Sequence, residues 1–529
     1  MQAAEYAVTL DETAETRELF AQCIRLVRFT AENESLRHLL VRALREGWGR
    51  PRDLAGVCIS AIKAKSTVKD LMARVNSAWP ERLPPGEMLA LSDSALAQDP
   101  LLCELLKSDL LADLDLERVF TNLRYALLTI NDSAERGEAP LAFYCDVARQ
   151  CFNNQFVFAM TAAEGAQASE LRIALQTALA DRRPIPAIWP VVVGAYFPLH
   201  RIAGCEVLLA GSWPEAVRNL LVQLVAEPLE ERRIATTIPA LTGIVGEVSQ
   251  AVRGLYEESP YPRWIEAGPP VRPTIFADAP RTSAHDVLIA GCGTGLSTIE
   301  FARHAVDARI LAIDLSLASL SYAKRMAQKH GITNIEFAQA DITQLDSMSR
   351  TFDFIDASGV LHHLADLWHG WRLLLALLRP GGAMQVGLYS ELARQNVVAA
   401  RALIAARGYP PTPDGIRLCR QDIMASDDPL LKSVLQWSDF YSMDECRDLL
   451  FHVQEHRVTL PQIKSFLAAN NVKFAGFFMP DTSIPQRFKS RFPGEDSVLL
   501  DLDCWHSFET ETPNVFAGMY QFWTRKPVA

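Results

Sequence analysis

The chain has 529 residues, of which 49% are hydrophobic and 22% are charged, and its formal net charge at pH 7 is −11. This length exceeds one typical hydrophobic core, so we expect two to four domains in an ordinary globular protein. The negative charge argues against general nucleic-acid binding, because nucleic-acid-binding proteins present basic surfaces. No apolar stretch is long enough to span a bilayer, and the first residues lack the basic and apolar parts of a signal peptide.

The ten cysteines are scattered singly, and no Cys/His group has zinc spacing. We therefore expect reduced thiols in a cytoplasmic protein, with no metal site and no membrane contact. The oligomeric state stays open.

Residues 1–250 show the periodicity of helices, because apolar residues recur three or four positions apart, as at Leu19, Cys23 and Val27. Prolines at 80–85, 184–186 and 228 predict helix ends. We expect a helical domain over 1–250, and whether it contains repeats or two subdomains is left open. Prolines follow an aromatic and charged segment at 254–264, so residues 251–284 are expected to form a linker or lid.

From residue 285 short apolar runs alternate with helical stretches. Strands are expected at 286–291, 309–314, 335–341, 352–360 and 383–390, and two more at 472–479 and 515–525. A mostly helical insertion is expected at about 391–470. This alternation predicts an α/β domain over 285–529, with a doubly wound, mainly parallel sheet.

The most informative motif is the loop Gly291-Cys-Gly-Thr-Gly295, which follows the first strand, and Asp314 ends the second. Glycines let the backbone turn tightly and approach a ligand, and an acid in the position of Asp314 can accept hydrogen bonds from a ribose diol. The dinucleotide-binding motif G-x-G-x-x-G needs a glycine where this chain has Leu296. The loop thus indicates an adenosine-containing cofactor without deciding which one.

Further motifs occur in a fixed order along the chain. The glycine loop, Asp314, Ala340-Asp341-Ile342, Ser358-Gly-Val-Leu-His-His363 and Arg379-Pro-Gly-Gly382 follow one another. With this set the chain resembles the class I S-adenosylmethionine-dependent methyltransferases over about residues 285–395, and less clearly to 525. The resemblance implies their α/β fold, methyl transfer, and S-adenosyl-L-methionine as cofactor.

The resemblance also implies roles for the residues of these motifs. Gly291, Cys292, Gly293 and Gly295 would run along the methionine portion of the cofactor, and Asp314 would bind both ribose hydroxyls with Leu315 beside the adenine. Asp341 would accept a hydrogen bond from the adenine amino group, Ile342 would pack on the ring, and Ser358 and Gly359 would lie under the sulfonium. From the residues alone, Asp314 could instead cap a helix and Asp341 could stabilise a turn.

The chain departs from the family pattern at one position. The family often has an acid two residues before the first glycine, which helps to hold the cofactor's amino group, whereas this chain has Ile289. That contact is either lost or supplied by another residue, such as Glu257 or Glu258.

Candidates to orient or deprotonate the methyl acceptor are His363 and His362, which follow strand four, and Tyr389 and Glu391, which end strand five. Ligands of open α/β sheets gather at these strand ends, and histidine exchanges protons near neutral pH. Tyr256, Tyr261, Arg263 and Trp264 form a candidate lid, with domain packing as the alternative.

The acceptor class is not settled by the sequence. The Leu-His-His pattern resembles small-molecule O-, C- or N-methyltransferases, whereas a large helical domain suits recognition of a protein or peptide. We expect a methyltransferase acting on a protein or peptide acceptor. The alternatives are a small-molecule methyltransferase and a scaffold protein that binds the cofactor without turnover.

Overall fold

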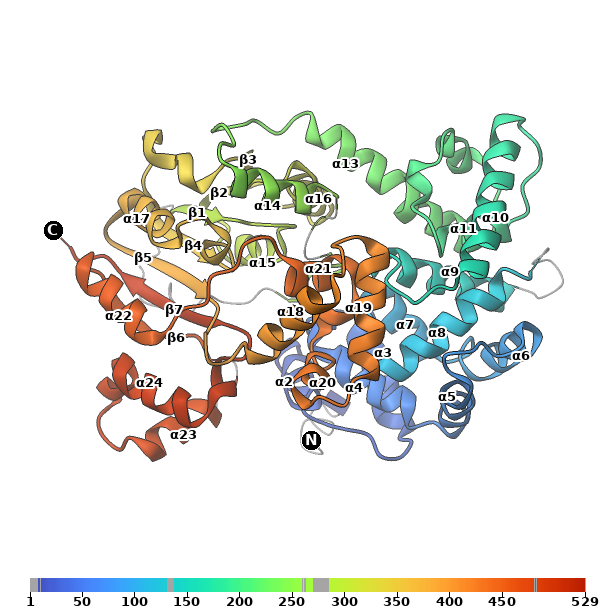
Figure 1. Cartoon of the computed structure of the whole chain (residues 1–529), viewed down its shortest axis with the longest axis horizontal. Helices are drawn as coiled ribbons and strands as arrows, with labels where there is room; N and C mark the ends of the chain where they lie inside the picture. The colour runs from blue at the N-terminus through green and yellow to red at the C-terminus, as the bar shows by residue number, and fades with distance from the viewer. Residues whose placement is uncertain are drawn as a thin grey trace.

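The structure is a computed structural model that describes residues 8–9, 11–130, 138–258, 260, 263–269, 285–479, 481 and 483–528. A large helical body lies beside a seven-stranded sheet that is covered by helices (Figure 1). No helix among the described residues has the length and apolarity needed to cross a membrane.

The first half of the chain is helical, as its periodicity predicts. Its α-helices are α2 (Ala14–Ile24), α3 (Glu34–Arg45), α4 (Pro51–Lys63), α5 (Ser66–Ala78), α6 (Pro85–Ala95), α7 (Pro100–Ser108), α8 (Leu114–Leu127), α9 (Glu138–Asn153), α10 (Ala162–Ala180), α11 (Ile188–Gly194), α12 (Glu215–Leu221), α13 (Glu227–Ala235) and α14 (Glu247–Glu258).

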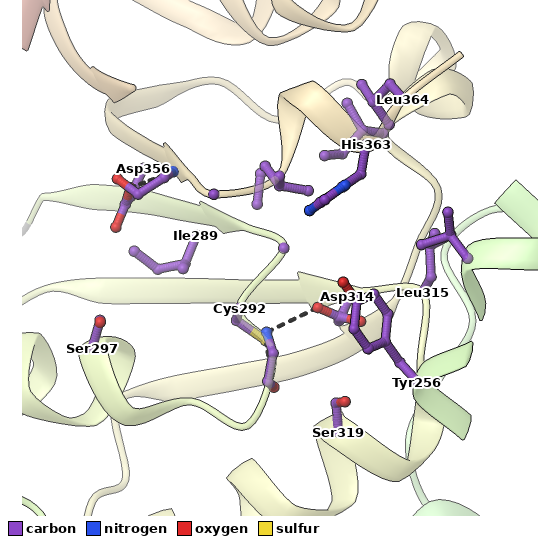
Figure 2. A pocket seen from close by; sticks show the side chains of 18 of the residues that line it. Tyr256, Ile289, Cys292, Ser297, Asp314, Leu315, Ser319, Asp356, His363 and Leu364 are labelled. Carbon is purple, nitrogen blue, oxygen red and sulfur yellow. Dashed lines mark hydrogen bonds between the residues drawn. The ribbon is translucent and has the colours of Figure 1, made fainter. Parts of the chain in front are cut away.

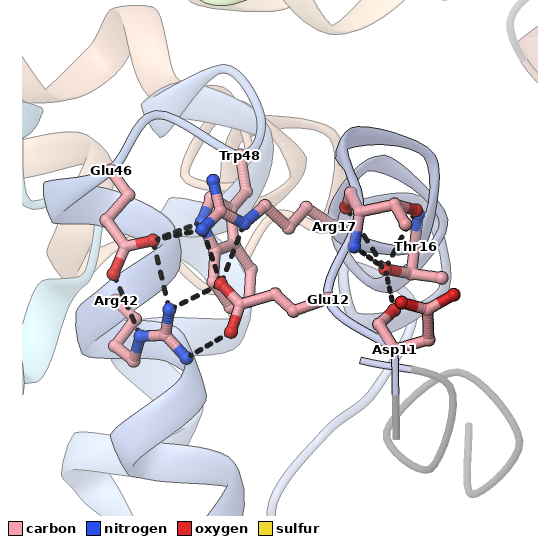
Figure 3. Close-up of polar contacts among 8 residues, drawn as sticks. Asp11, Glu12, Thr16, Arg17, Arg42, Glu46 and Trp48 are labelled. Atoms are coloured by element: carbon pink, nitrogen blue, oxygen red, sulfur yellow. Dashed lines mark hydrogen bonds and ion pairs between the residues drawn. The ribbon is translucent and has the colours of Figure 1, made fainter. Parts of the chain in front are cut away.

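A polar cluster attaches α2 to α3 near the start of the body (Figure 3). The carboxylate of Glu12 accepts hydrogen bonds from Arg42 and Arg17, and Arg42 also pairs with Glu46 at 2.8 Å. These hydrogen bonds lower the pKa of Glu12 to about 2, and the bond from Arg42 has the largest effect. The guanidinium of Arg42 lies 5.0 Å from the ring centroid of the buried Trp48. The cluster orients the two helices around this ring, and because its ion pairs are exposed it contributes little stability.

The prolines end helices in two of the three predicted places. α5 ends before Pro80 and α10 ends before Pro184, as expected. The helix end predicted at Pro228 is wrong, because the chain runs from α12 through a π-helical turn at Val222–Ala226 directly into α13. Pro228 stands at the first turn of α13, where a missing backbone N–H is tolerated, and the wider π turn accommodates the proline ring.

The sheet comprises β1 (Asp286–Ala290), β2 (Arg309–Asp314), β3 (Ile335–Gln339), β4 (Phe352–Ser358), β5 (Leu378–Leu388), β6 (Lys473–Phe477) and β7 (Tyr520–Arg525), in the order β3-β2-β1-β4-β5-β7-β6. The first five strands are parallel, and β7 is antiparallel to both β5 and β6. The expected α/β fold of class I methyltransferases, preceded by a helical region, is confirmed.

Helices pack on both faces of this sheet. They are α15 (Leu296–His304), α16 (Leu317–Lys329), α17 (Leu367–Leu377), α22 (Leu460–Ala469), α23 (Ser483–Arg491) and α24 (Leu502–Glu511). One apolar core joins the sheet to α17, α22 and α24, and a second joins it to α15 and α16. Ile234 and Ile238 enter the second core, so the end of α13 and the chain just after it pack against the sheet.

The helices after β5 belong to the helical body in their packing. They are α18 (Gln395–Arg407), α19 (Pro413–Ala425), α20 (Pro429–Val434) and α21 (Met443–Phe451), and their apolar residues share the core of the N-terminal helices. Arg52 of α4 pairs with Glu445 of α21 at 2.8 Å, and Figure 1 draws the two helices in the same part of the molecule. Arg420 of α19 forms a buried ion pair with Glu117 of α8 at 2.6 Å, and its guanidinium also donates to the backbone carbonyl of Phe440. The core of the helical body is therefore built from two stretches of chain, with the strands β1 to β5 between them.

Candidate active site

The glycine loop is held by the backbone of the neighbouring strand. The N–H groups of Gly291 and Cys292 donate to the carbonyl of Ile313 at 2.8 and 3.0 Å. Gly291 and Gly295 have positive φ angles of 74° and 80°. A Cβ on Gly291 would lie 2.5 Å from Val360, and one on Gly295 would lie 2.7 Å from the Cβ of Ala323, so both positions require glycine.

Asp314 ties this loop to the end of β2. Its carboxylate accepts the N–H of Gly293 at 2.8 Å and the N–H of Ser316 at 2.9 Å (Figure 2). Burial raises the pKa of Asp314, and these hydrogen bonds oppose that shift. A carboxylate has about four lone-pair sites, so Asp314 can hold the loop and still accept hydrogen bonds from a ligand.

Asp341 follows β3 and has an unused carboxylate oxygen. Its side chain is fully buried, and Oδ1 accepts hydrogen bonds from the N–H and the hydroxyl of Thr343 at 2.9 and 2.7 Å. Oδ2 has no partner among the described residues. A buried carboxylate oxygen without a partner is costly, so this position favours a ligand with an N–H donor. The adenine amino group is such a donor.

A cavity of about 240 Å³ lies over the carboxyl ends of the central strands. Its lining includes Val252, Tyr256, Ile289, Gly291, Cys292, Gly293, Ser297, Asp314, Leu315, Ser319, Asp341, Ile342, Asp356, Ser358, Gly359, Val360, His363, Leu364, Tyr389, Asp448 and Met519. Four lining residues are aspartates, and none is lysine or arginine among those described. The cavity therefore suits a cationic, nucleoside-bearing ligand.

The expected cofactor residues meet in this cavity, with one exception. Gly291, Cys292, Gly293, Asp314, Leu315, Asp341, Ile342, Ser358 and Gly359 all line it. Gly295 does not, since it packs against α16. Burial raises the pKa of the Cys292 thiol, so this cysteine stays protonated at neutral pH.

His363 presents a free nitrogen in the cavity. Its Nδ1 lies 2.8 Å from the carbonyl oxygen of Gln454. A carbonyl only accepts, so Nδ1 carries the proton and Nε2 keeps its lone pair. Figure 2 shows the tip of the ring pointing into the cavity. Burial lowers the pKa of His363 to about 4, so the imidazole is neutral at physiological pH.

The other three acceptor candidates lie in different surroundings. Tyr389 lines the cavity, and the guanidinium of Arg394 lies 3.5 Å from its ring centroid. His362 is fully buried with its ring centroid 3.8 Å from that of Tyr389, and it does not line the cavity. Glu391 is exposed and also lies outside the lining.

The candidate lid residues are separated in space. Tyr256 of α14 lines the cavity, whereas Trp264 is buried behind the glycine loop and donates its indole N–H to the carbonyl of Thr294 at 3.0 Å. Arg263 lies over the ring of Phe152, 4.4 Å from its centroid, away from the cavity. Tyr261 lies outside the described residues. Glu257 caps α16 by accepting the N–H of Leu317 at 2.7 Å, and it does not line the cavity.

Sequence reasoning missed two acidic residues of the cavity. Asp448 comes from α21, within the helical stretch after β5, and its carboxylate accepts a hydrogen bond from the Tyr256 hydroxyl. Asp356 lies on β4, two residues before Ser358. Asp356 is one of two acids in the strand β4, and an acid in the middle of this strand was a visible signal, whereas no sequence pattern pointed to Asp448.

His363, Asp448 and His452 form a buried group whose ligand atoms lie within 4.8 Å of one another, close enough to raise the question of a metal. Nδ1 of His452 accepts the N–H of Gln454 at 3.1 Å, so the neutral ring carries its proton on Nε2. That Nε2 is 3.9 Å from Asp448. The group therefore offers one free imidazole lone pair, on Nε2 of His363, and one carboxylate, which is fewer ligands than a metal centre in proteins usually has.

Comparison with known proteins bears on this site directly. Residues 287–382 match the family model described as a methyltransferase domain. The chain contains a methyltransferase domain. The matched residues run from β1 into β5 and include the glycine loop, Asp314, Asp341 and His363. The cofactor of this domain is S-adenosyl-L-methionine, and the partnerless oxygen of Asp341 together with the acidic lining of the cavity fits it.

Several known proteins are similar to part of this chain. The uncharacterized protein syc1184_c of Synechococcus sp. is 30% identical over 260 residues, 45% of this chain and 62% of that protein. A ubiquinone biosynthesis O-methyltransferase of Methylocella silvestris is 39% identical over 98 residues, 18% of this chain and 37% of that enzyme. The chain thus spans less than two thirds of the length of these relatives. The structure of PKMT2 from Rickettsia typhi in complex with AdoHcy covers 54% of this chain and 53% of its own, with 16% identity and a TM-score of 0.36.

Proposed function

We propose that this chain is an S-adenosylmethionine-dependent methyltransferase whose acceptor is a protein or peptide recognised through the helical body. The observation that supports the proposal is that one wall of the cavity is formed by residues outside the matched methyltransferase domain. Tyr256 and Asp448 lie outside residues 287–382, and Asp448 stands on a helix of the helical body's core. A surface that reaches the reacting centre from the helical body can position a large acceptor there.

The roles of the residues follow from their contacts. When bound, the cofactor supplies an electrophilic methyl group on a sulfonium. Asp341 would hold the adenine amino group and Asp314 the ribose hydroxyls, while the small residues Ser358 and Gly359 leave room at the reacting centre. Bringing the acceptor atom and the methyl carbon together supplies much of the rate gain in such a displacement.

The proton of the acceptor needs a destination. As the acceptor lone pair forms its bond to the methyl carbon and the carbon–sulfur bond breaks, the acceptor loses a proton. Nε2 of His363 has a free lone pair in the cavity and can take it. Tyr389 and the Tyr256–Asp448 pair lie in the same lining and would orient the acceptor.

A labelling experiment tests the proposed acceptor class. Purified protein and cofactor carrying a labelled methyl group are added to an extract from cells that lack this protein, and protein and small-molecule fractions are then separated. The proposal predicts label in the protein fraction, and a His363→Gln variant should incorporate far less. Label confined to small molecules would support the small-molecule alternative, and cofactor binding without incorporation would support the scaffold alternative.

A further inference from the structure

The cavity is lined by more acidic residues than the binding of a neutral nucleoside requires. Of its four lining aspartates, Asp314 and Asp341 lie where ribose and adenine would bind, and Asp448 already accepts a hydrogen bond from Tyr256. Asp356 is left without an assigned role. No lysine or arginine lines the cavity among the described residues.

Asp356 stands beside Ile289, the position at which an acid is missing from β1. β1 and β4 are parallel neighbours, and Ile289 is the register partner of Asp356. Paired residues of adjacent strands project from the same face of a sheet, so a carboxylate on β4 reaches the space that one on β1 would reach. In Figure 2 the two side chains lie together at one end of the cavity, and Leu315 and Tyr256 lie at the other.

The surroundings of Asp356 favour the binding of a positively charged ligand group. Its Oδ1 accepts the N–H of Ser358 at 2.9 Å, and among the described residues it pairs with no lysine or arginine. Burial raises the pKa of this carboxyl. A largely desolvated carboxylate whose hydrogen bonds come from Ser358 alone is stabilised when a cationic ligand group binds beside it.

We infer that Asp356 binds the ammonium group of the cofactor's methionine portion and replaces, from the neighbouring strand, the acid that is absent at Ile289. Asp341, which follows β3 and has a free oxygen, is separated from Asp356 on β4 by β2 and β1, so the two carboxylates can hold opposite ends of the ligand. Asp356 is therefore a cofactor-specificity residue. The inference concerns the cofactor alone and does not depend on the acceptor class.

Two ligands separate this role from a general effect on the fold. S-adenosylhomocysteine carries the ammonium group, and 5′-methylthioadenosine lacks the whole amino-acid portion. Calorimetric titration of Asp356→Asn should show S-adenosylhomocysteine binding weakened by about tenfold or more, because a charge-assisted contact is lost. The affinity for 5′-methylthioadenosine should change by less than about twofold.

Matched variants complete the experiment. Asp353→Asn alters an acid on the same strand that pairs with Arg379 at 2.7 Å and does not line the cavity, and it should leave both affinities unchanged. Ile289→Asp added to Asp356→Asn should recover S-adenosylhomocysteine binding. Asp356→Ser is measured alongside in case the asparagine variant does not fold. Unchanged S-adenosylhomocysteine affinity, or an equal loss for both ligands in a folded variant, would overturn the inference.

Discussion

The hydroxyl of Tyr256 donates a hydrogen bond to the carboxylate of Asp448, and this bond joins α14 to α21 at the wall of the cavity. Asp448 is buried and Tyr256 is half-buried, and burial raises the pKa of each. The bond links the chain segment before the sheet to the helical stretch after β5. It therefore connects this part of the cavity wall to the helical body.

Tyr256→Phe should weaken acceptor use more than cofactor binding. Without the hydroxyl, Asp448 loses its donor and its position, so we expect transfer rates to fall by about tenfold, the usual scale for one buried hydrogen bond to a charged group. The affinity for S-adenosylhomocysteine should change by less than about threefold, which is a free-energy difference no larger than that of one weak contact. Tyr409→Phe, which removes a similar bond to Asp422 at the solvent-exposed surface, is the matched control and should be silent. Equal effects from the two variants would contradict this assignment.

Gly293→Val should abolish cofactor binding. Gly293 has a positive φ of 52°, and its N–H holds Asp314, so a branched side chain strains the loop and intrudes on the cavity. Gly331→Val serves as control, because Gly331 also has a positive φ, of 67°, with open space around it. Titration with S-adenosylhomocysteine should show binding in the control only. Retained binding in folded Gly293→Val would reduce the loop to a structural turn.

Asp341→Asn should change the preferred base of the ligand. The free Oδ2 of Asp341 suits an amino donor, whereas the asparagine amide would place N–H groups there while its oxygen still accepts from Thr343. We expect weaker binding of S-adenosylhomocysteine and stronger binding of S-inosylhomocysteine, which has a carbonyl in place of the amino group. A variant that loses both ligands equally would argue against an adenine contact at Asp341.

The pH dependence of transfer should lack the usual histidine inflection. The pKa of His363 is lowered to about 4, so its basic form predominates above pH 5 and is lost only as the pH falls through about 4. We expect kcat/KM to show no loss from this group between pH 7.5 and 5.5. In His363→Gln the rate should fall by about a hundredfold or more, the scale of general-base catalysis, with cofactor affinity retained. An acid limb near pH 6.5 that disappears in His363→Gln would contradict the shifted pKa.

Breaking the ion pair between Arg420 and Glu117 should destabilise the helical body. Both side chains are buried, and removal of one partner leaves an uncompensated charge, which typically costs about 3–5 kcal/mol. Thermal unfolding of Arg420→Ala should occur at a clearly lower temperature than that of the wild type. Arg491→Ala removes an exposed pair with Glu511 and should change the midpoint little.

The sheet and the cofactor motifs were predictable because their signals are local. Strand β2 begins and ends where the apolar run 309–314 predicts, and the loop that follows β1 is identified by its own glycines. The contact between Tyr256 and Asp448 was not predictable, since 192 positions separate the two residues and no pattern relates them. Pro228 misled for a different reason, because a π turn allowed the helix to continue through a residue that usually ends one.

The role of Asp356 was predictable only in part. The missing acid at Ile289 and the unexpected acid on β4 were both visible in the sequence, but only the strand register places them side by side. The pairing of β1 with β4 thus relates these two positions, Ile289 and Asp356, to one candidate contact with the cofactor.

Titration of the wild-type protein with S-adenosylhomocysteine tests the central claim most directly. The account predicts saturable binding of one molecule per chain, with an affinity that falls in Asp314→Ala and Asp341→Ala while both variants keep the wild-type circular dichroism spectrum. Absence of binding to the folded wild-type protein, or binding that both variants leave unchanged, would contradict the assignment of this cavity as the methyl-donor site.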